Sequence, residues 1–349
     1  QIKMAIVFSG ANLPQSQLEE IQSEIYADWG TFRDGDVNIQ PGHKSGTEVY
    51  ESKVTVNQTA YSSAAVSAGS DTLTVGRTPV TLTKVQYQDT IDYNTLLDTR
   101  FEKTMKAGAF NLVSSEFDRK VLIDITPAIS ADMESKTRDG ATTAQKVAIA
   151  ALIPGAPQGS ISAGAQTLVA AMPVNLVNSF PATILYNASQ SKDTPGAGLG
   201  DYKKVLSISA VTSANIAAQY ALAYATIDPK VLGNTSEPPV WYAPLSHKQL
   251  IKIANNAVGA AQQVNFLVEG AGASEKVYYN GIEIKFKPLV GFMIVSNPKY
   301  LIILMDLAGD LSGLETGQMA NGAQQMYYKN VQAFATWVTN QRYIVLYGG

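Results

Sequence analysis

The segment from Thr47 to Tyr93 places the tightest limit on what this chain can fold into. Its two ends alternate polar and apolar side chains with a period of two, which is typical of β-strands. Between them, Ser62 to Gly69 is dominated by serine, alanine and glycine. The pattern predicts a long β-hairpin whose first strand lies at Val49 to Val56 and whose second half lies at Val80 to Tyr87.

A two-stranded hairpin is marginally stable in water when it stands alone. This one is poor in large apolar residues, so it needs a surface to lie on. If its own domain does not supply that surface, a neighbouring subunit must. We therefore expect self-assembly contacts at apolar and aromatic positions of the hairpin and of the helix before it, namely Tyr50, Val54, Val56, Tyr61, Val75, Val80, Leu82, Tyr87 and Trp29.

Charged residues are scarce, and this also favours burial against other protein. They make up 16% of the 349 residues, while hydrophobic residues make up 46%. Soluble domains usually carry roughly 25% charged residues. A surface with little charge and many small polar groups suits packing against other subunits, although an ordinary globular protein with an uncharged surface stays an open alternative.

The composition argues against several classes of function. The net charge of -3 and the pI of 5.5 provide no positive field for neutralising phosphates, so we expect no sequence-specific DNA binding. Cysteine is absent, which excludes disulfides, thiolate metal sites and cysteine nucleophiles. No apolar run approaches the roughly 20 residues of a membrane helix. Because glutamine does not initiate translation, we expect the original beginning of the chain to precede Gln1.

Helical periodicity appears twice in the first half of the chain. Leu13 to Trp29 predicts a short helix within an otherwise extended arm that continues through Gly30 to Lys44. A longer helix is predicted over Ser115 to Arg138, where apolar residues recur every four positions. Pro127 would kink that helix. The alternative is a strand at Val121 to Ile125, followed by a helix with Thr126 as N-cap. The periodic positions of the long helix are Phe117, Val121, Ile125, Ile129 and Met133.

The remainder predicts a second helix at Thr142 to Leu152, then a mixed region from Ala165 to Tyr300 and closing strands. Strands in the mixed region are expected at Ala182–Tyr186, Val240–Ala243 and Gly281–Phe286, and helices at Ser213–Tyr224 and Ser246–Asn256. The closing strands are expected at Leu301–Met305, Asn330–Trp337 and Arg342–Tyr347.

Motifs that carry catalysis are not convincingly present. Gly159 to Gly164 has the wrong spacing for a nucleophile elbow, and Gly196 to Gly200 lacks the dinucleotide-binding spacing. Ser296 to Lys299 matches Ser-x-x-Lys, but its Asn-Pro step indicates a turn. His247 has no sequence neighbour that suggests a triad or zinc site, so we expect a surface or capping residue. Asp306, Asp310 and Glu315 could ligate a hard cation, but a solvent-facing loop fits them better.

Two stretches carry a family resemblance. Tyr278-Tyr-Asn-Gly-Ile-Glu-Ile-Lys-Phe-Lys-Pro288, followed by Asn297-Pro-Lys-Tyr-Leu-Ile-Ile-Leu-Met-Asp306, resembles a strand with a glycine turn, a proline, and a strand ending in aspartate. Asn330 to Trp337, with Tyr343 to Tyr347, resembles the closing strands of the same family. Together with the order of the elements, these stretches resemble the major capsid proteins of tailed bacteriophages, which have the Hong Kong 97-type fold that encapsulin shells also have.

The resemblance implies an α+β protein with five segments. These are an N-terminal arm at 1–45, an E-loop hairpin at 46–95, a first part of the P-domain with the spine helix at 96–164, an A-domain at 165–300, and closing P-domain strands at 301–349. Some family members crosslink lysine to asparagine, but nothing in this sequence singles out such a pair, and we expect none.

The implied function is a coat protein that assembles in many copies, as pentamers and hexamers, into an icosahedral shell around double-stranded DNA. Portal and scaffolding or decoration proteins are the implied partners, and no membrane, metal or cofactor is expected. The chain would not be an enzyme. It would lie in the virion capsid after assembly in the host cytoplasm. The alternatives are an encapsulin-like nanocompartment, an unrecognised enzyme and a tail component.

Overall fold

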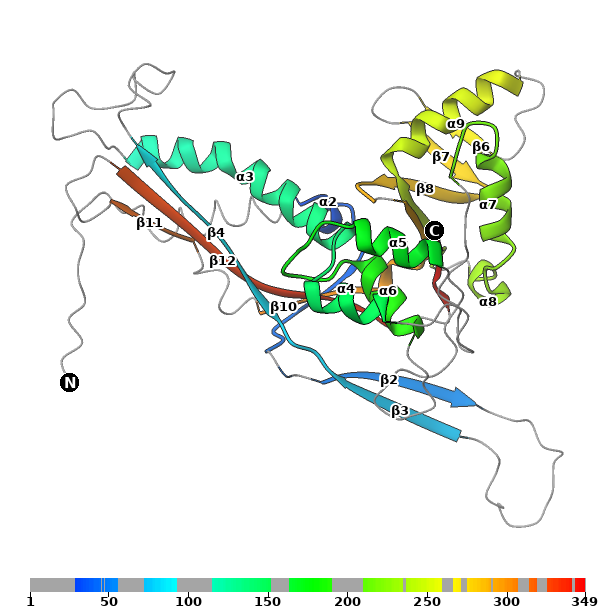
Figure 1. Ribbon diagram of the computed structural model, residues 1–349, viewed down its shortest axis with the longest axis horizontal. Helices are drawn as coiled ribbons and strands as arrows, with labels where there is room; N and C mark the ends of the chain where they lie inside the picture. Colours follow the sequence, from blue (N-terminus) through cyan, green and yellow to red (C-terminus); the bar gives the residue numbers. More distant parts are fainter. Residues whose placement is uncertain are drawn as a thin grey trace, which may run out of the picture. The chain divides into compact units, whose positions relative to one another are not determined.

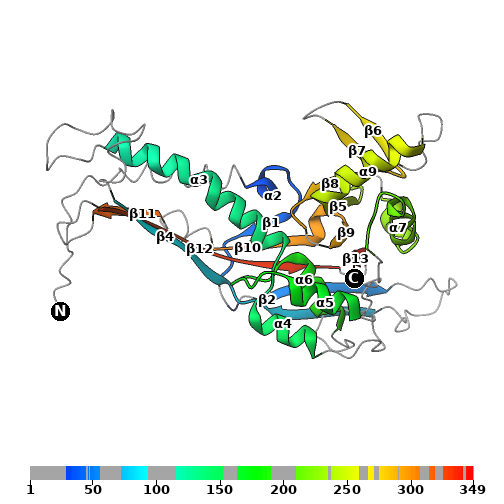
Figure 2. The ribbon, with the colours of Figure 1, turned by 45° about the horizontal axis from the view of Figure 1, so that its top comes forward.

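The computed structural model describes residues 29–44, 46, 48–55, 72–92, 115–151, 163–189, 210–234, 237–258, 266–270, 275–289, 291–306, 314–318, 325–340 and 343–348 (Figures 1 and 2). The chain divides into two compact units. The first contains Gln1–Lys44, Leu82–Glu134 and Leu304–Phe334, and the second contains Ser45–Thr81, Ser135–Ile303 and Ala335–Gly349. Three elements, α3, β10 and β12, contribute residues to both units.

The first unit is organised around a five-stranded sheet in the order β1-β10-β12-β11, with β4 also paired to β12. Both β4 and β11 run antiparallel to β12. Two helices, α2 (Gly30–Arg33) and α3 (Ser115–Arg138), complete the described part of this unit. The strands are β1 (Asn38–Pro41), β4 (Thr83–Asp92), β10 (Leu301–Met305), β11 (Leu314–Gln318) and β12 (Gln325–Val338).

The predicted long helix is confirmed as the single helix α3, with Pro127 inside it. The alternative strand at Val121–Ile125 is wrong. Of the periodic apolar positions, Ile129 and Met133 are buried. The Ser130 hydroxyl donates a hydrogen bond to the carbonyl of Thr126, 3.0 Å away, in the turn that contains the proline. Apolar spacing therefore outweighs one helix-breaking residue here.

The arm predicted over Gly30–Lys44 is more structured than expected. It contains α2 and β1, and β1 pairs with β10 at the edge of the five-stranded sheet. This stretch is therefore part of the fold of its own chain. The helix predicted over Leu13–Trp29 lies outside the described residues except for Trp29 itself.

The second unit contains a six-stranded sheet in the order β13-β9-β5-β8-β7-β6. β5 and β8 run parallel, and the other described pairs are antiparallel. The strands are β5 (Val240–Pro244), β6 (Phe266–Glu269), β7 (Lys276–Tyr279), β8 (Ile282–Lys287), β9 (Phe292–Ser296) and β13 (Val345–Gly348). The helices are α4 (Thr143–Ala150), α5 (Ala163–Ala171), α6 (Phe180–Ser189), α7 (Ile216–Tyr224), α8 (Pro229–Leu232) and α9 (Leu245–Val258), and the 3-10 helix η5 covers Pro298–Tyr300.

Aromatic side chains fill the core beside this sheet. The ring of Tyr220 in α7 packs against three other aromatic rings. The distances between ring centroids are 5.0 Å to Trp241, 5.1 Å to Phe266 and 5.4 Å to Tyr279. All four side chains are buried. Such contacts add to the burial of apolar surface, so α7 is firmly anchored to the sheet.

Several predicted elements of the second unit are confirmed, and one is corrected. The strands at Val240–Ala243 and Gly281–Phe286 are β5 and β8, and the helices at Ser213–Tyr224 and Ser246–Asn256 are α7 and α9. The strand predicted at Ala182–Tyr186 is wrong, because these residues lie in α6 and are nearly all buried. A short apolar run does not distinguish a strand from a buried helix. The last closing strand, β13, pairs with β9 and so lies in the six-stranded sheet.

The predicted hairpin has a different second strand. β2 (Glu48–Thr55) pairs with β3 (Thr72–Pro79), from Glu48 opposite Pro79 to Thr55 opposite Thr72. Val80 to Tyr87 was expected to fill that place. Instead, the chain leaves the hairpin after Pro79 and enters β4, which pairs with β12. Alternation continues through both strands, so periodicity alone could not assign the partner.

The C-terminal end of α3 is held inside the second unit. The guanidinium of Arg138 is fully buried and lies 4.9 Å from the ring centroid of Tyr242 and 5.8 Å from that of Phe180. Gly140 follows with a φ of +107°, and the Asn175 amide donates a 2.8 Å hydrogen bond to the Asp139 carbonyl. The chain reverses here in a conformation that only glycine adopts easily.

We expect Gly140→Ala to destabilise the chain more than Gly281→Ala. A Cβ at Gly140 would lie 2.6 Å from Cγ of Asn175 and closer still to its amide nitrogen, whereas one at Gly281, with a φ of +79°, would have no atom within 4 Å. Backbone strain alone costs about 1–2 kcal/mol, so Gly281→Ala should lose about that much and Gly140→Ala more. Urea unfolding followed by circular dichroism measures both. Equal losses of stability would show that the Asn175 side chain moves away from the new Cβ at no cost in free energy.

Candidate assembly surface

The β2–β3 ribbon, defined as Glu48–Thr55 paired with Thr72–Pro79, is the part of the described chain with the least support from other strands. It forms a two-stranded sheet of its own, drawn in Figure 1 as two adjacent strands. No third described strand pairs with it. Each outer edge therefore carries backbone N–H and C=O groups that can pair with another chain. Such an edge is a ready site for contact between copies.

The predicted contact residues of the hairpin are only partly described. Tyr50, Val54 and Val75 lie on the ribbon, but their side chains are outside what the structure describes, as are residues Val56 and Tyr61 altogether. Their roles in assembly stay predictions.

Three further predicted contact residues lie in the interior of the chain. Trp29 has no exposed surface, and its ring packs edge-on against Phe334 at a centroid distance of 6.0 Å. Val80 and Leu82, between β3 and β4, are 7% and 8% exposed. In this conformation they offer almost no area to a neighbour. Contacts through them stay predictions that would require the chain to open locally.

Tyr87 connects β4 to α3. Its hydroxyl donates a 2.7 Å hydrogen bond to Oδ2 of Asp132, and its backbone lies opposite Asn330 of β12. Burial, together with the hydrogen bond to this carboxylate, raises the pKa of Tyr87. The residue therefore has a clear role within the first unit, whether or not it also contacts a neighbour.

Sequence reasoning missed a set of large apolar side chains that are exposed on the described surface. None of them lies in the predicted hairpin. The signal that could have found some of them is the lack of any charged residue between Lys146 and Lys192. The exposed residues are Ile123, Val147, Val174, Leu176, Leu222, Leu232, Leu245, Ile253 and Leu267.

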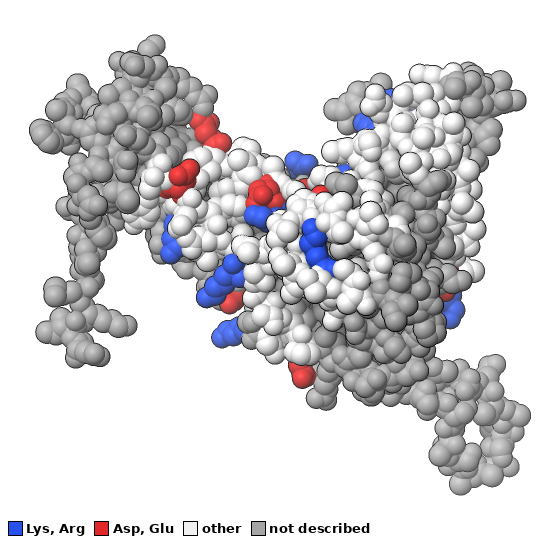
Figure 3. All heavy atoms as spheres, viewed as in Figure 1, with Lys and Arg blue, Asp and Glu red and all other residues white. Residues whose placement is uncertain are grey.

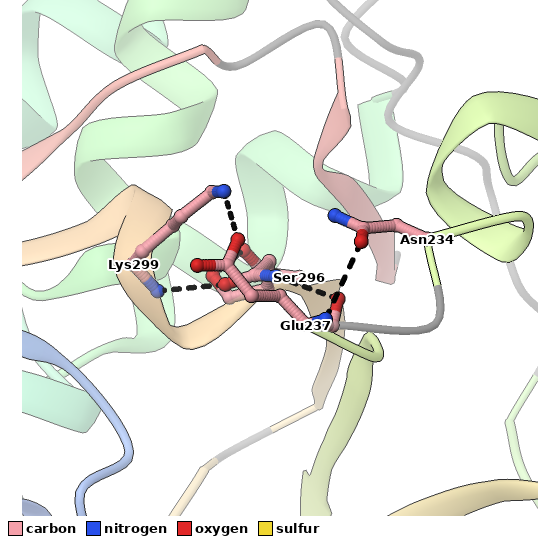
Figure 4. A network of polar contacts seen from close by, with 5 residues as sticks. Asn234, Glu237, Ser296 and Lys299 are labelled. Carbon is pink, nitrogen blue, oxygen red and sulfur yellow. Dashed lines mark hydrogen bonds and ion pairs between the residues drawn. The ribbon is translucent and has the colours of Figure 1, made fainter.

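The Ser-x-x-Lys stretch is engaged in a local polar network (Figure 4). Lys299 forms an ion pair with Glu237, whose backbone N–H donates to Asn234 Oδ1 at 3.3 Å. The Ser296 hydroxyl donates to the carbonyl of Asn297 at 2.9 Å, and the Asn297 amide donates to the Glu237 carbonyl at 2.8 Å. The Glu237 partner raises the pKa of Lys299, which keeps the amine protonated. The network ties the loop before β5 to the end of β9 and does not present a base to the serine.

His247 is not the surface residue expected from the sequence. It is 5% exposed at the start of α9, and its Nδ1 lies 3.2 Å from the hydroxyl of Tyr220. Burial lowers its pKa to about 4. A neutral imidazole thus fills part of the aromatic core, because the turn that begins α9 points this side chain inward.

Metal and membrane sites find no support among the described residues. No three described His, Asp or Glu side chains lie close enough together to hold a metal ion. Of the three carboxylates considered from the sequence, Asp306 is described, Asp310 is outside the described residues, and the side chain of Glu315 is not described. None of the described helices is both long enough and apolar enough to cross a lipid bilayer.

Comparison with solved structures identifies the architecture. A chain of the satellite phage P4 procapsid, which includes the size determination (Sid) protein, superposes with a TM-score of 0.52 at 9% sequence identity. The match covers 95% of this chain and 98% of that one. The chain has the Hong Kong 97-type capsid fold. At this identity the comparison establishes the fold alone.

Two other solved structures are similar at a lower level. The capsid of an empty GTA particle gives a TM-score of 0.48 at 9% identity and covers 100% of this chain and 94% of that chain. The holo-SrpI encapsulin complex of Synechococcus elongatus PCC 7942 gives 0.44 at 11% identity, with coverages of 89% and 84%. No protein-family model and no curated protein matches the sequence.

We expect Tyr87→Phe to destabilise the chain by about 1–2 kcal/mol, because it removes the hydrogen bond to Asp132 while keeping the ring. A double-mutant cycle with Asp132→Asn, measured by urea unfolding, isolates this bond. The two losses should not add. Fully additive losses would mean that the hydroxyl and the carboxylate do not interact. The predicted assembly contact would then be the one role left for Tyr87.

We expect the stability of the chain to fall as the pH drops from about 6.5 toward 4. An unfolded histidine has a pKa of about 6.5, so the unfolded chain takes up a proton before buried His247 does, which favours unfolding. The effect of this one group at pH 4 is roughly 3 kcal/mol. His247→Gln should flatten the pH dependence of the urea midpoint in this window. An unchanged pH profile in the variant would rule out His247 as its source.

Proposed function

We propose that this chain is a major capsid protein that assembles in many copies into a closed shell. The observation that carries the proposal is the match along nearly the whole of both chains to a subunit of a phage procapsid. A Hong Kong 97-type fold suits a structural role. We therefore propose that the chain is not an enzyme and needs no cofactor.

The β2–β3 ribbon supports the proposal by its chemistry. Its outer edges have backbone groups to satisfy, and Val56 to Asp71, which joins its strands, carries Asp71 as its single charged residue. Burying such a segment on a neighbour removes little hydration from charged groups. Interfaces of obligate assemblies exceed about 2,000 Å², and a subunit in a shell has several neighbours. Modest contacts then add up around a closed surface.

The proposed shell is icosahedral, built of pentamers and hexamers, and encloses double-stranded DNA in a virion assembled in the host cytoplasm. The net charge of -3 is compatible with DNA that is enclosed without sequence-specific binding. Portal and scaffolding or decoration proteins are the proposed partners. An encapsulin-like compartment has the same fold and differs in its contents.

Electron microscopy of the purified full chain tests the proposal. Closed particles support a shell. Nuclease-resistant DNA within particles from the natural source supports a capsid, whereas an enclosed protein supports a nanocompartment. Tubes or rings would indicate a tail component, and only small particles at high protein concentration would contradict the shell.

Deletion of Tyr61 to Asp71 tests the role of the hairpin. The residues removed lie between β2 and β3, so the described core of both units should keep its fold and its circular dichroism spectrum. Particle formation should be lost, because the segment that reaches a neighbour is shortened. Normal particles from this variant, seen in micrographs at the same concentration as the parent, would refute the role of the hairpin.

A further inference from the structure

The turn between β7 and β8 consists of Asn280 and Gly281, and both residues are exposed. Their φ angles are +47° and +79°, and Tyr279 lies opposite Ile282 across the turn. A two-residue hairpin loop with two positive φ angles is a type I′ turn, for which Asn-Gly is a preferred sequence. A Cβ added at Gly281 would have no heavy atom within 4 Å. The turn therefore places an exposed asparagine directly before an unhindered backbone nitrogen.

This sequence allows asparagine to lose its amide. Asparagine is one of the thermolabile residues of proteins, and a following glycine has no Cβ to hinder attack by its nitrogen. The backbone nitrogen of Gly281 bonds to Cγ of Asn280, the bond from Cγ to Nδ2 breaks, and ammonia leaves with the proton that the backbone nitrogen gives up. Water then opens the five-membered imide at either carbonyl. The products are aspartate and isoaspartate, and the sum of both steps is hydrolysis of one amide.

The folded turn keeps the two reacting atoms apart. For the ring to close, Cβ of Asn280 and the nitrogen of Gly281 must eclipse each other about the Cα–C bond of Asn280. The first central residue of a type I′ turn has a ψ of about +30°. In an L-residue at that angle, Cβ points almost to the opposite side from the next nitrogen. The bond has to rotate out of the turn conformation, so the turn must open before the reaction can occur.

Opening of the turn is opposed by the core of the second unit. β7 pairs with β8 on one edge and with β6 on the other. Tyr279 and Ile282, which flank the turn, are both buried. The Tyr279 ring packs against those of Tyr220 and Phe266, at centroid distances of 5.4 Å and 5.1 Å. These contacts have to loosen when the turn opens, so the opened population of the folded chain is small.

We propose that Asn280 is a site of spontaneous deamidation and that the folded β7–β8 turn protects it, so that the modification accumulates on chains whose turn has opened. This modification is independent of the proposed shell function. Isoaspartate adds a carbon to the backbone, so a two-residue turn can no longer join the strands in the same register. Chains that carry isoaspartate are therefore less stable when they refold.

Deamidation also changes the charge of the chain. Both products carry a carboxylate, so each conversion makes the net charge of -3 more negative by one. Charged side chains are sparse over the described atoms in the view of Figure 3. Ion-exchange chromatography can therefore separate modified from unmodified chains.

Incubation of the purified full chain in mildly alkaline buffer, with and without guanidinium chloride, tests the proposal. Trypsin cuts after Lys276 and Lys285, and mass spectrometry of the peptide between these sites gives the fraction of Asn280 converted. Conversion should be at least about tenfold faster in guanidinium, because every turn is then open. Asn256, which is exposed in α9 and precedes Ala257, is the internal control and should stay largely unconverted in both samples.

Three outcomes would contradict the proposal. Equal rates with and without guanidinium would overturn protection by the turn. Conversion of Asn280 no faster than that of Asn256 in guanidinium would show that Asn280 is not a favoured site. Gly281→Ala should slow conversion in guanidinium severalfold, because its Cβ hinders the attacking nitrogen. An unchanged rate in this unfolded variant would show that the nitrogen of residue 281 is not the attacking group.

A core substitution tests the link to opening without denaturant. Val277 of β7 is 2% exposed, and Val277→Ala removes buried apolar contacts, which lowers the cost of opening and should raise conversion in the folded chain at least about threefold. Val147→Ala, at a 65% exposed position of α4, is the matched control and should leave the rate unchanged. Circular dichroism confirms that both variants fold. A folded Val277→Ala chain that converts at the parent rate would overturn the dependence on opening.

Discussion

Pairing along both edges of β12 is the interaction on which the first unit depends. β4 is matched to it over residues 325–334, while β11 occupies part of the opposite edge and β10 joins the same sheet. As an interior strand it buries Asn330 and Gln332 completely, and neither side-chain amide has a hydrogen-bond partner among the described residues. Unpaired buried amides oppose folding, so the backbone ladder must supply enough stability to offset them. The Tyr87–Asp132 hydrogen bond adds a side-chain connection from this sheet to α3.

Much of this architecture could be predicted because periodicity and turn chemistry agree. α3 follows from a four-residue apolar repeat strong enough to override Pro127, and the turn at Asn280 and Gly281, both with positive φ, defines β7 and β8. The failures occur where periodicity carries no information. α6 is buried nearly all round, so it lacks the polar face of a typical helix. The partner of β2 and the sheet that receives β13 depend on contacts between distant parts of the chain, which a local pattern does not encode.

The candidate contact residues show a second limit of prediction from sequence. Trp29 and Leu82 are apolar because they fill the interior of one chain, whereas Val147 and Val174 are apolar on its surface. Interiors and permanent interfaces prefer the same side chains, so residue type alone does not separate them. The sequence carries one further signal, because exposed Val147 and Val174 both lie in the run between Lys146 and Lys192 that has no charged residue.

The open edges of the β2–β3 ribbon also limit how long an unassembled subunit can persist. Within the described part of the chain no strand pairs with the outer edges of this ribbon, and an open strand edge can pair with other extended polypeptides. The useful lifetime of an unassembled molecule is then finite. If the chain assembles as proposed, its synthesis and its incorporation have to keep pace, because the ribbon that would connect neighbours would also let unassembled copies aggregate.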